Sequence, residues 1–153
     1  MNVTIVAGRQ WPQELDQLMR DLPDWFGIES SIVSYVDAAR TLPTAAALRN
    51  DEFVGGCVVR PHTPRAAEIE LLAVSPALHR QGIGRQLVDA VEADLGNQGI
   101  ELLQVKTSGP SGGSEEYERT RAFYEAIGFI PLEERTDIWG PGNPCLILVK
   151  PLR

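Results

Sequence analysis

A loop rich in glycine and arginine follows an apolar, strand-like stretch of the chain and is suited to hold a phosphate group. It reads His79-Arg80-Gln81-Gly82-Ile83-Gly84-Arg85 and leads into a helical pattern. The first turn of a helix carries backbone N–H groups without intrahelical partners, and the helix dipole adds positive potential there. Glycines let an anion come close to these groups, and arginines add charge-assisted hydrogen bonds. The loop therefore predicts a phosphorylated ligand; the alternative is a helix start that binds nothing.

Two common nucleotide loops do not fit this segment. A dinucleotide fingerprint requires a third glycine where the chain has Leu87. An ATP-type loop requires Gly-Lys-Ser/Thr, whereas here Gly84 is followed by Arg85 and Gln86.

Two glutamates, Glu68 and Glu70, lie in the strand-like stretch 66–74 that precedes the loop. Side chains two residues apart on a strand share a face, predicted here to be that of Leu72 and Val74. Buried carboxylates are costly, so such a pair in a central strand is unusual. A carboxylate can accept the proton of an amine, which makes the pair a candidate general base. The alternative is two solvated acids on an open part of the strand.

The loop resembles the pyrophosphate loop of the GNAT superfamily of N-acetyltransferases, Gln/Arg-x-x-Gly-x-Gly/Ala, with His79 in place of the usual first residue. A second segment is similar to the later signature of that family, an aromatic-tyrosine pair followed by Gly-Phe: Thr120-Arg121-Ala122-Phe123-Tyr124-Glu125-Ala126-Ile127-Gly128-Phe129. The resemblance implies transfer of an acetyl group from acetyl-CoA to a primary amine by direct attack. No cysteine stands at a helix start near the loop, which disfavours a covalent acyl-enzyme.

The resemblance also implies where acetyl-CoA is held. The backbone at the end of the strand would bind its pantetheine arm, and the loop would bind its pyrophosphate. The expected cofactor-binding residues are Leu72, Ala73, Val74, His79, Arg80, Gln81, Gly82, Ile83, Gly84 and Arg85. Tyr117 and Thr120 depart from the asparagine and alanine that the family often carries, so an asparagine contact to the cofactor is not expected.

Three side chains are the expected catalytic residues. Glu68 falls where the histone-acetylating branch of the family carries its glutamate, and it is the first choice for the base, with Glu70 second. A base is needed because a lysine-like amine has a pKa of about 10.4 and must lose a proton. Tyr124 matches the family's tyrosine and would protonate the departing thiolate; the alternative is a core tyrosine beside Phe123.

Composition narrows the remaining possibilities. The net charge of −7 argues against nucleic acid as a partner. No apolar run approaches the ~20 residues that span a bilayer, and the N-terminus has no secretory pattern, so a cytoplasmic protein without a membrane partner is expected. Cys57 and Cys145 are expected to be buried free thiols, and no cluster predicts a metal.

The pattern of elements predicts a single α/β domain over residues 1–153. We expect a mixed, mostly antiparallel sheet flanked by helices in the order βααβββαβαββ, as in the GNAT fold. Helices are expected from Pro12, over 29–41, over 82–95, and from a cap at Ser114 to Gly128. Strands are expected at 2–7, 44–49, 53–60, 66–74, 100–107, 129–136 and 144–150, with loops at 61–65 and 108–114.

The acceptor site is the least defined part of the prediction. In this fold it is built by the first two helices, their connecting loop and the last hairpin, where Trp25, Phe26, Glu29 and Trp139 lie. These aromatic residues are expected to form a cation-binding or apolar wall, to pack internally, or to contact a second copy in a homodimer. The alternative function is a noncatalytic acyl-CoA-binding or sensing module of the same fold.

Overall fold

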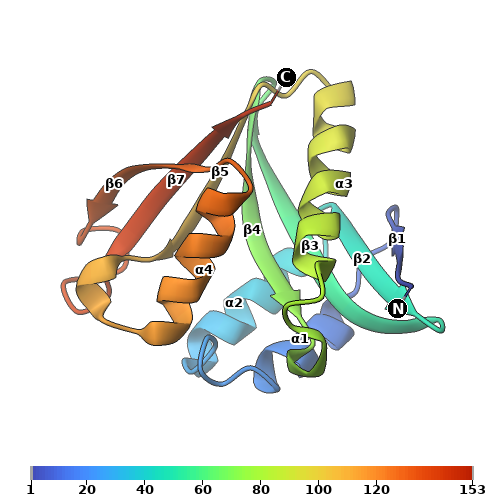
Figure 1. Cartoon of the computed structure of the whole chain (residues 1–153), viewed down its shortest axis with the longest axis horizontal. Coiled ribbons are helices and arrows are strands. Elements are labelled where there is room, and N and C mark those ends of the chain that lie inside the picture. Colours follow the sequence, from blue (N-terminus) through green and yellow to red (C-terminus); the bar gives the residue numbers. More distant parts are fainter. Residues whose placement is uncertain (1, 153) are drawn as a thin grey trace.

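The computed structural model describes residues 2–152, and its strands form one sheet in the order β1-β2-β3-β4-β5-β7-β6 (Figure 1). β4 and β5 are parallel, and every other neighbouring pair is antiparallel. The strands are β1 (Thr4–Val6), β2 (Thr44–Arg49), β3 (Glu52–Thr63), β4 (Ala66–Val74), β5 (Leu102–Ser108), β6 (Ile130–Arg135) and β7 (Cys145–Pro151). The helices are α1 (Pro12–Arg20), α2 (Glu29–Ala39), α3 (Ile83–Asn97) and α4 (Glu115–Ala126), with short 3-10 turns η1 (Pro76–Leu78) and η2 (Pro110–Gly112). The predicted element order and mixed sheet are confirmed.

Each face of the sheet is covered by two helices. On one face, α3 buries Ile83, Leu87, Val91 and Leu95 at helical spacing in a cluster that also contains Tyr124 of α4. On the other face, α1 and α2 pack against β3 and β4 in separate clusters. The sheet therefore has an α3/α4 face and an α1/α2 face, each with its own core.

The sheet is forked in its middle. β4 and β5 are paired only from Ala66 with Leu102 to Ile69 with Val105. Beyond that point the two strands diverge, as Figure 1 shows, so residues 70–74 of β4 have no strand on the β5 side. The fork leaves backbone N–H and C=O groups of β4 available to a ligand.

A β-bulge at Glu70 reverses which side chains share a face. Val58 pairs with Leu71 but Val59 pairs with Ile69, so Glu70 is an extra residue in β4. Ile69 and Leu72 consequently pack in the same cluster, on the α3/α4 face, whereas Leu71 packs on the α1/α2 face.

The prediction that Glu68 and Glu70 share a face with Leu72 and Val74 is therefore wrong. The two glutamates do share a face, because Arg60 pairs with Glu68 across the strands and also reaches the Glu70 carboxylate. That face is the α1/α2 face. Strict alternation fails here because the bulge inserts one residue.

The predicted loop at 61–65 is largely strand, since β3 continues to Thr63. Pro61 has no N–H to donate to a neighbouring strand. A strand accepts proline here because β2 ends opposite Val58, which leaves the edge of β3 unpaired on that side at Pro61. The strands predicted at 44–49 and 53–60 are joined by a tight hairpin turn, with Asn50 and Asp51 at φ of 52° and 65°.

Two further findings concern the cysteines and the length of the helices. Cys57 and Cys145 are buried free thiols, as predicted. Within residues 2–152, no helix has the length and apolar character needed to cross a membrane.

Candidate active site

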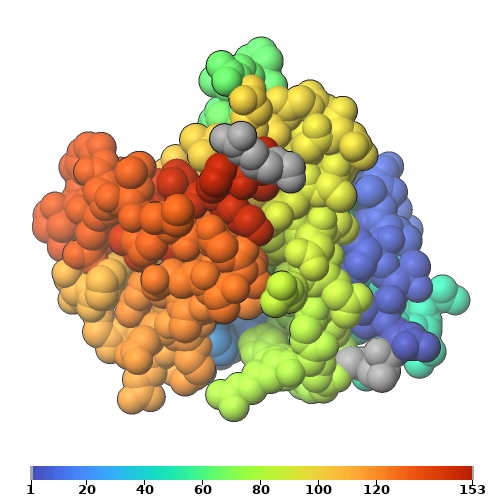
Figure 2. All heavy atoms as spheres, turned by 45° about the horizontal axis from the view of Figure 1, so that its top comes forward, coloured from blue at the N-terminus to red at the C-terminus, as the bar shows by residue number. Residues whose placement is uncertain are grey.

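A cavity of about 950 Å³ lies at the fork and connects the two faces of the sheet. Its walls include Leu72 and Phe123 from the α3/α4 cluster, and Phe26 and Leu71 from the α1/α2 clusters. In the space-filling view the surface is hollowed between α4 and the start of α3 (Figure 2). A molecule at the fork can thus be reached from both faces.

The glycine-rich loop forms one end of this cavity. Of its seven residues from His79 to Arg85, six line the cavity and Gln81 does not. Gly82, the residue before α3, has φ of +82°, a left-handed conformation that glycine adopts without strain. A Cβ on Gly84 would lie 3.3 Å from Cζ of Phe123, so glycine lets the start of α3 approach α4. The loop thus places the N-terminus of α3 at the cavity wall.

His79 has a structural contact that explains its place in the loop. Its Nε2 donates a hydrogen bond of 2.8 Å to the carbonyl oxygen of Val74. The loop is thereby tied to the end of β4, whose residues Leu72, Ala73 and Val74 line the cavity along the unpaired edge. The expected pantetheine-binding and pyrophosphate-binding residues therefore lie next to one another.

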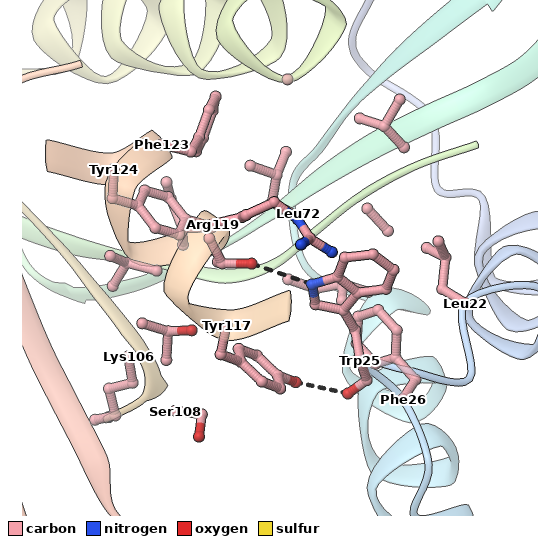
Figure 3. A pocket seen from close by; sticks show the side chains of 18 of the residues that line it. Leu22, Trp25, Phe26, Leu72, Lys106, Ser108, Tyr117, Arg119, Phe123 and Tyr124 are labelled. Carbon is pink, nitrogen blue, oxygen red and sulfur yellow. Dashed lines mark hydrogen bonds between the residues drawn. The ribbon is translucent and has the colours of Figure 1, made fainter. Parts of the chain in front are cut away.

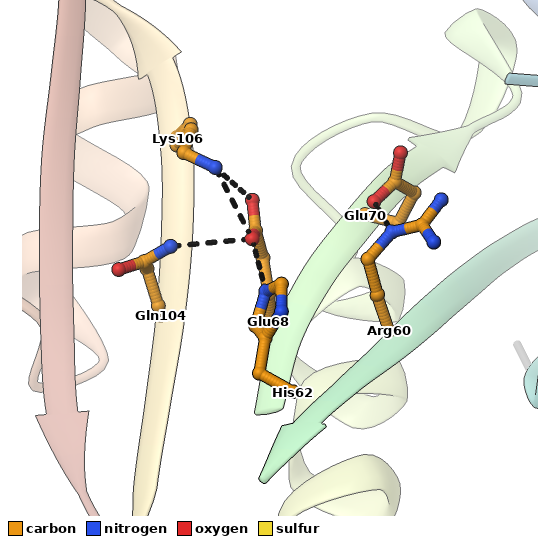
Figure 4. Close-up of polar contacts among 6 residues, drawn as sticks. All are labelled: Arg60, His62, Glu68, Glu70, Gln104 and Lys106. Atoms are coloured by element: carbon orange, nitrogen blue, oxygen red, sulfur yellow. Dashed lines mark hydrogen bonds and ion pairs between the residues drawn. The ribbon is translucent and has the colours of Figure 1, made fainter. Parts of the chain in front are cut away.

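Glu70 lines the cavity at the point where the fork opens. Arg60 Nε donates a hydrogen bond of 2.8 Å to Oε1 of Glu70, and this contact raises the pKa of the Arg60 guanidinium (Figure 4). The side chain of Glu70 is 22% exposed. Its second oxygen, Oε2, is thus available to a molecule in the cavity.

Glu68 lies on the same face but in different surroundings. Its carboxylate accepts hydrogen bonds from Nε2 of His62 at 2.7 Å, Nε2 of Gln104 at 3.2 Å and Nζ of Lys106 at 3.2 Å (Figure 4). The side chain is 8% exposed, and Glu68 is not among the residues that line the cavity. Such a carboxylate is occupied by structural contacts that hold β3, β4 and β5 together.

Tyr124 lines the cavity from the α3/α4 face and is 4% exposed. Its ring packs edge-to-face on Phe123 and Phe129, at 5.2 and 5.3 Å between centroids. Burial is the largest cause that raises the pKa of Tyr124 far above that of a free tyrosine. The hydroxyl is therefore protonated at neutral pH and can donate a hydrogen bond.

Trp25, in the loop between α1 and α2, closes the cavity against α4 (Figure 3). Its Nε1 donates a 3.1 Å hydrogen bond to Oγ1 of Thr120, and its carbonyl accepts a 2.6 Å bond from the hydroxyl of Tyr117. Its ring also lies edge-on to His79, with 5.5 Å between centroids. The two positions where the chain departs from the family pattern, Tyr117 and Thr120, thus hold this loop.

Some lining residues were not predicted from the sequence. Tyr35 of α2 and Arg119 of α4 both face the cavity. Their helices were predicted, but only the packing shows which side of each helix meets the fork. Glu29, in contrast, was placed near the acceptor but forms a bidentate pair with Arg20, at 2.7 and 2.9 Å, and does not line the cavity.

Positively charged residues outnumber negatively charged residues around the cavity, although the protein has a net charge of −7. The arginine and lysine residues that line it are Arg80, Arg85, Lys106 and Arg119, whereas Glu70 is the one carboxylate among the described residues that line it. Two of these arginines belong to the loop. A concentration of cations in an acidic protein favours an anionic ligand.

Comparisons with known proteins agree with this architecture. Residues 42–131 match the family model described as acetyltransferase (GNAT) domain, so the chain belongs to the GNAT family of acetyltransferases. A curated relative, an uncharacterized N-acetyltransferase of Chlorobaculum tepidum, is 28% identical over 97 residues, which are 61% of this chain and 56% of that protein. The match thus spans little more than half of the relative.

Solved structures share the fold over their whole length. A GNAT-family protein from Desulfovibrio desulfuricans superposes with a TM-score of 0.82 and 22% identity, covering 99% of this chain and 100% of its own. A GNAT-family acetyltransferase from Elizabethkingia anophelis, solved with acetyl-CoA bound, gives a TM-score of 0.73 and 23% identity, covering 99% of both chains. At these identities the likeness establishes the fold.

Proposed function

We propose that this protein is an N-acetyltransferase that moves an acetyl group from acetyl-CoA to a primary amine by direct attack. The observation that carries the proposal is the cavity at the fork, which has a cationic loop at one end and a carboxylate on the opposite face of the sheet. Donor and acceptor can then approach from different faces and meet between β4 and β5.

The residues of the α3/α4 face suit acetyl-CoA. Backbone N–H groups at the start of α3, with Arg80 and Arg85, would bind its pyrophosphate. The unpaired edge at Leu72–Val74 would hydrogen-bond its pantetheine arm in the manner of an added strand. When bound, acetyl-CoA supplies an acetyl group activated as a thioester. The structure from Elizabethkingia anophelis, which shares this fold, has acetyl-CoA bound, and this supports acetyl-CoA as the ligand.

Glu70 is the better placed of the two candidate bases. An amine with a pKa near 10.4 costs about 4–5 kcal/mol to deprotonate at pH 7, so a proton acceptor at the fork assists the attack. Glu70 lines the cavity and has one free oxygen, whereas Glu68 is occupied by three donors from neighbouring strands. We therefore infer that Glu70 accepts the proton of the amine, directly or through one water.

Tyr124 would complete the proton balance. As the new C–N bond forms and the C–S bond breaks, the sulfur leaves as a thiolate and takes a proton from Tyr124, and the nitrogen releases its second proton, which returns Tyr124 to its neutral form. Tyr124 faces the cavity with a protonated hydroxyl, and among residues 2–152 nothing hydrogen-bonds to it. It is thus free to donate to the sulfur.

Ligand-induced stabilisation tests the cofactor. We would measure the thermal midpoint with acetyl-CoA, CoA, ATP and NAD in parallel. A ligand at 100 times its dissociation constant adds about 2.7 kcal/mol, which raises the midpoint by roughly 5–10 °C for a domain of this size. A rise with the CoA compounds alone supports the assignment, and no rise with them contradicts it. Binding without turnover on any amine would favour the noncatalytic acyl-CoA-binding module.

A further inference from the structure

Aromatic side chains form the wall of the cavity on the α1/α2 side. Trp25 and Phe26 come from the α1–α2 loop, Tyr35 from α2, Tyr117 from α4 and Trp139 from the segment between β6 and β7. Phe26 and Tyr35 meet edge-to-face at 6.0 Å, and Tyr117 bonds to the backbone of Trp25. Figure 3 shows Trp25, Phe26 and Tyr117 side by side. We name these five residues the aromatic wall.

The rim of the cavity on this side is apolar as well. Ile28 and Trp139 line the cavity and are 54% and 40% exposed, high values for large apolar side chains. Such exposed apolar groups at the mouth of a pocket are typical of ligand-binding surfaces. A molecule that enters here loses water from its own apolar surface and from these two residues.

The negative charge at this end of the cavity is small, whereas Arg119 and Lys106 add positive charge. Glu70 already pairs with Arg60, and Lys106 pairs with Glu68. Tyr35 lies near both glutamates, and burial together with their charges raises its pKa, so it remains neutral. A polycation needs several carboxylates to replace its hydration, and the described part of the cavity supplies one.

We propose that the acceptor is a small monoamine with a flat, aromatic body. This inference rests on the proposed acetyltransferase function and names its substrate class. The aromatic wall would bury the body of the acceptor, and ring faces would attract its single ammonium group before Glu70 takes the proton. A second positive charge on the acceptor would enter the same wall unpaired, and a carboxylate on the carbon that bears the amine would lie against the carboxylate of Glu70.

An acceptor panel tests the class. CoA release would be followed with 2-phenylethylamine, spermidine, kanamycin and L-phenylalanine at a fixed, saturating concentration of acetyl-CoA. We expect kcat/KM for 2-phenylethylamine to exceed that for each of the others by at least about tenfold, since a site that leaves charges unpaired discriminates strongly. Preference for spermidine, kanamycin or phenylalanine would overturn the class.

A pair of neighbouring variants tests the aromatic wall itself. Trp139→Ala removes a wall residue, whereas Ile138→Ala removes a side chain that is 38% exposed but does not line the cavity. We expect Trp139→Ala to raise KM for 2-phenylethylamine by about fivefold, the effect of one ring–ammonium contact. KM for acetyl-CoA should stay unchanged, and Ile138→Ala should change neither. Equal effects of the two variants would count against the wall.

The thermal midpoint separates the two levels of the proposal. If acetyl-CoA stabilises the protein and another class of amine is acetylated, the acceptor class is wrong and the acetyltransferase function stands. If acetyl-CoA does not stabilise the protein and no amine is acetylated, both are wrong.

Discussion

Glu68 and Glu70 stand on the same face of β4, yet we expect their loss to have different consequences. Glu70→Gln removes the proposed base and should lower kcat by about 100-fold, with the stabilisation by acetyl-CoA retained. Glu68→Gln is the matched control. This substitution removes the carboxylate that accepts hydrogen bonds from Lys106 and His62. It should therefore lower the free energy of unfolding by about 1–3 kcal/mol.

Steady-state kinetics and urea unfolding of both variants distinguish these roles. For Glu68→Gln, kcat measured on the folded protein should stay within a few-fold of the parent. If Glu68→Gln instead loses more activity than Glu70→Gln, the first choice made from the sequence, Glu68, is the base.

Tyr124→Phe removes one oxygen and leaves the aromatic packing in place. Because the hydroxyl would protonate the departing thiolate, we expect kcat to fall by at least about tenfold at pH 7. The deficit in kcat should shrink as the pH rises above the pKa of a free thiol, about 8.5, because the thiolate can then leave without taking a proton. A pH–rate profile of parent and variant checks this, and a deficit that is constant with pH would argue for a purely structural role.

At the scale of elements, the α1–α2 loop depends on its hydrogen bonds to α4. Tyr117→Phe removes the donor to the Trp25 carbonyl and should lower the free energy of unfolding by about 0.5–1.5 kcal/mol. Amide hydrogen exchange of residues 21–28 should become faster. Tyr35→Phe is a suitable control, because the Tyr35 hydroxyl has no hydrogen bond to the described residues. Equal exchange in both variants would show that the bond does not hold the loop.

The sequence predicted the elements better than their mutual contacts. The loop from His79 to Arg85 and the Tyr124 segment carry local signals, glycines and a helix start, that do not depend on distant residues. The bulge at Glu70 carries no such signal, because it arises from how β3 and β4 align. The hydrogen bonds of Trp25 could not be predicted from the sequence either, because its partners lie 92 and 95 residues away along the chain. The α3 start at Ile83 was predicted within one residue, whereas its end at Asn97 extends two residues further.

At the scale of the whole molecule, buried groups make stability depend on alkaline pH. Complete burial raises the pKa of the Cys57 thiol from 9.0 to about 12, and burial raises the pKa of Tyr117 from 10.0 to about 12. These groups ionise first in the unfolded chain. Their contribution is complete below pH 9 and is lost as the pH rises toward 12.

Urea unfolding at several values of pH from 8 to 11 checks this dependence. The Cys57 thiol should contribute a loss of about 1.4 kcal/mol for each pH unit above its unfolded pKa. Cys57→Ala lowers stability at every pH because it leaves a small cavity, but its decline above pH 9 should be shallower than that of the parent. Parallel declines would show that the thiol is not the group responsible.

The bridging position of the cavity has a consequence for how this protein can change over time. Under the proposed function, the donor would be served by β4, the loop before α3 and α4, while the acceptor would be served mainly by the α1–α2 loop, α2 and the segment before β7. These two sets occupy largely separate stretches of the chain. Under the proposed function, mutations that retune the choice of amine can therefore accumulate in the segments before β2 and between β6 and β7, while the segment from β4 to α4 keeps a constant acyl donor.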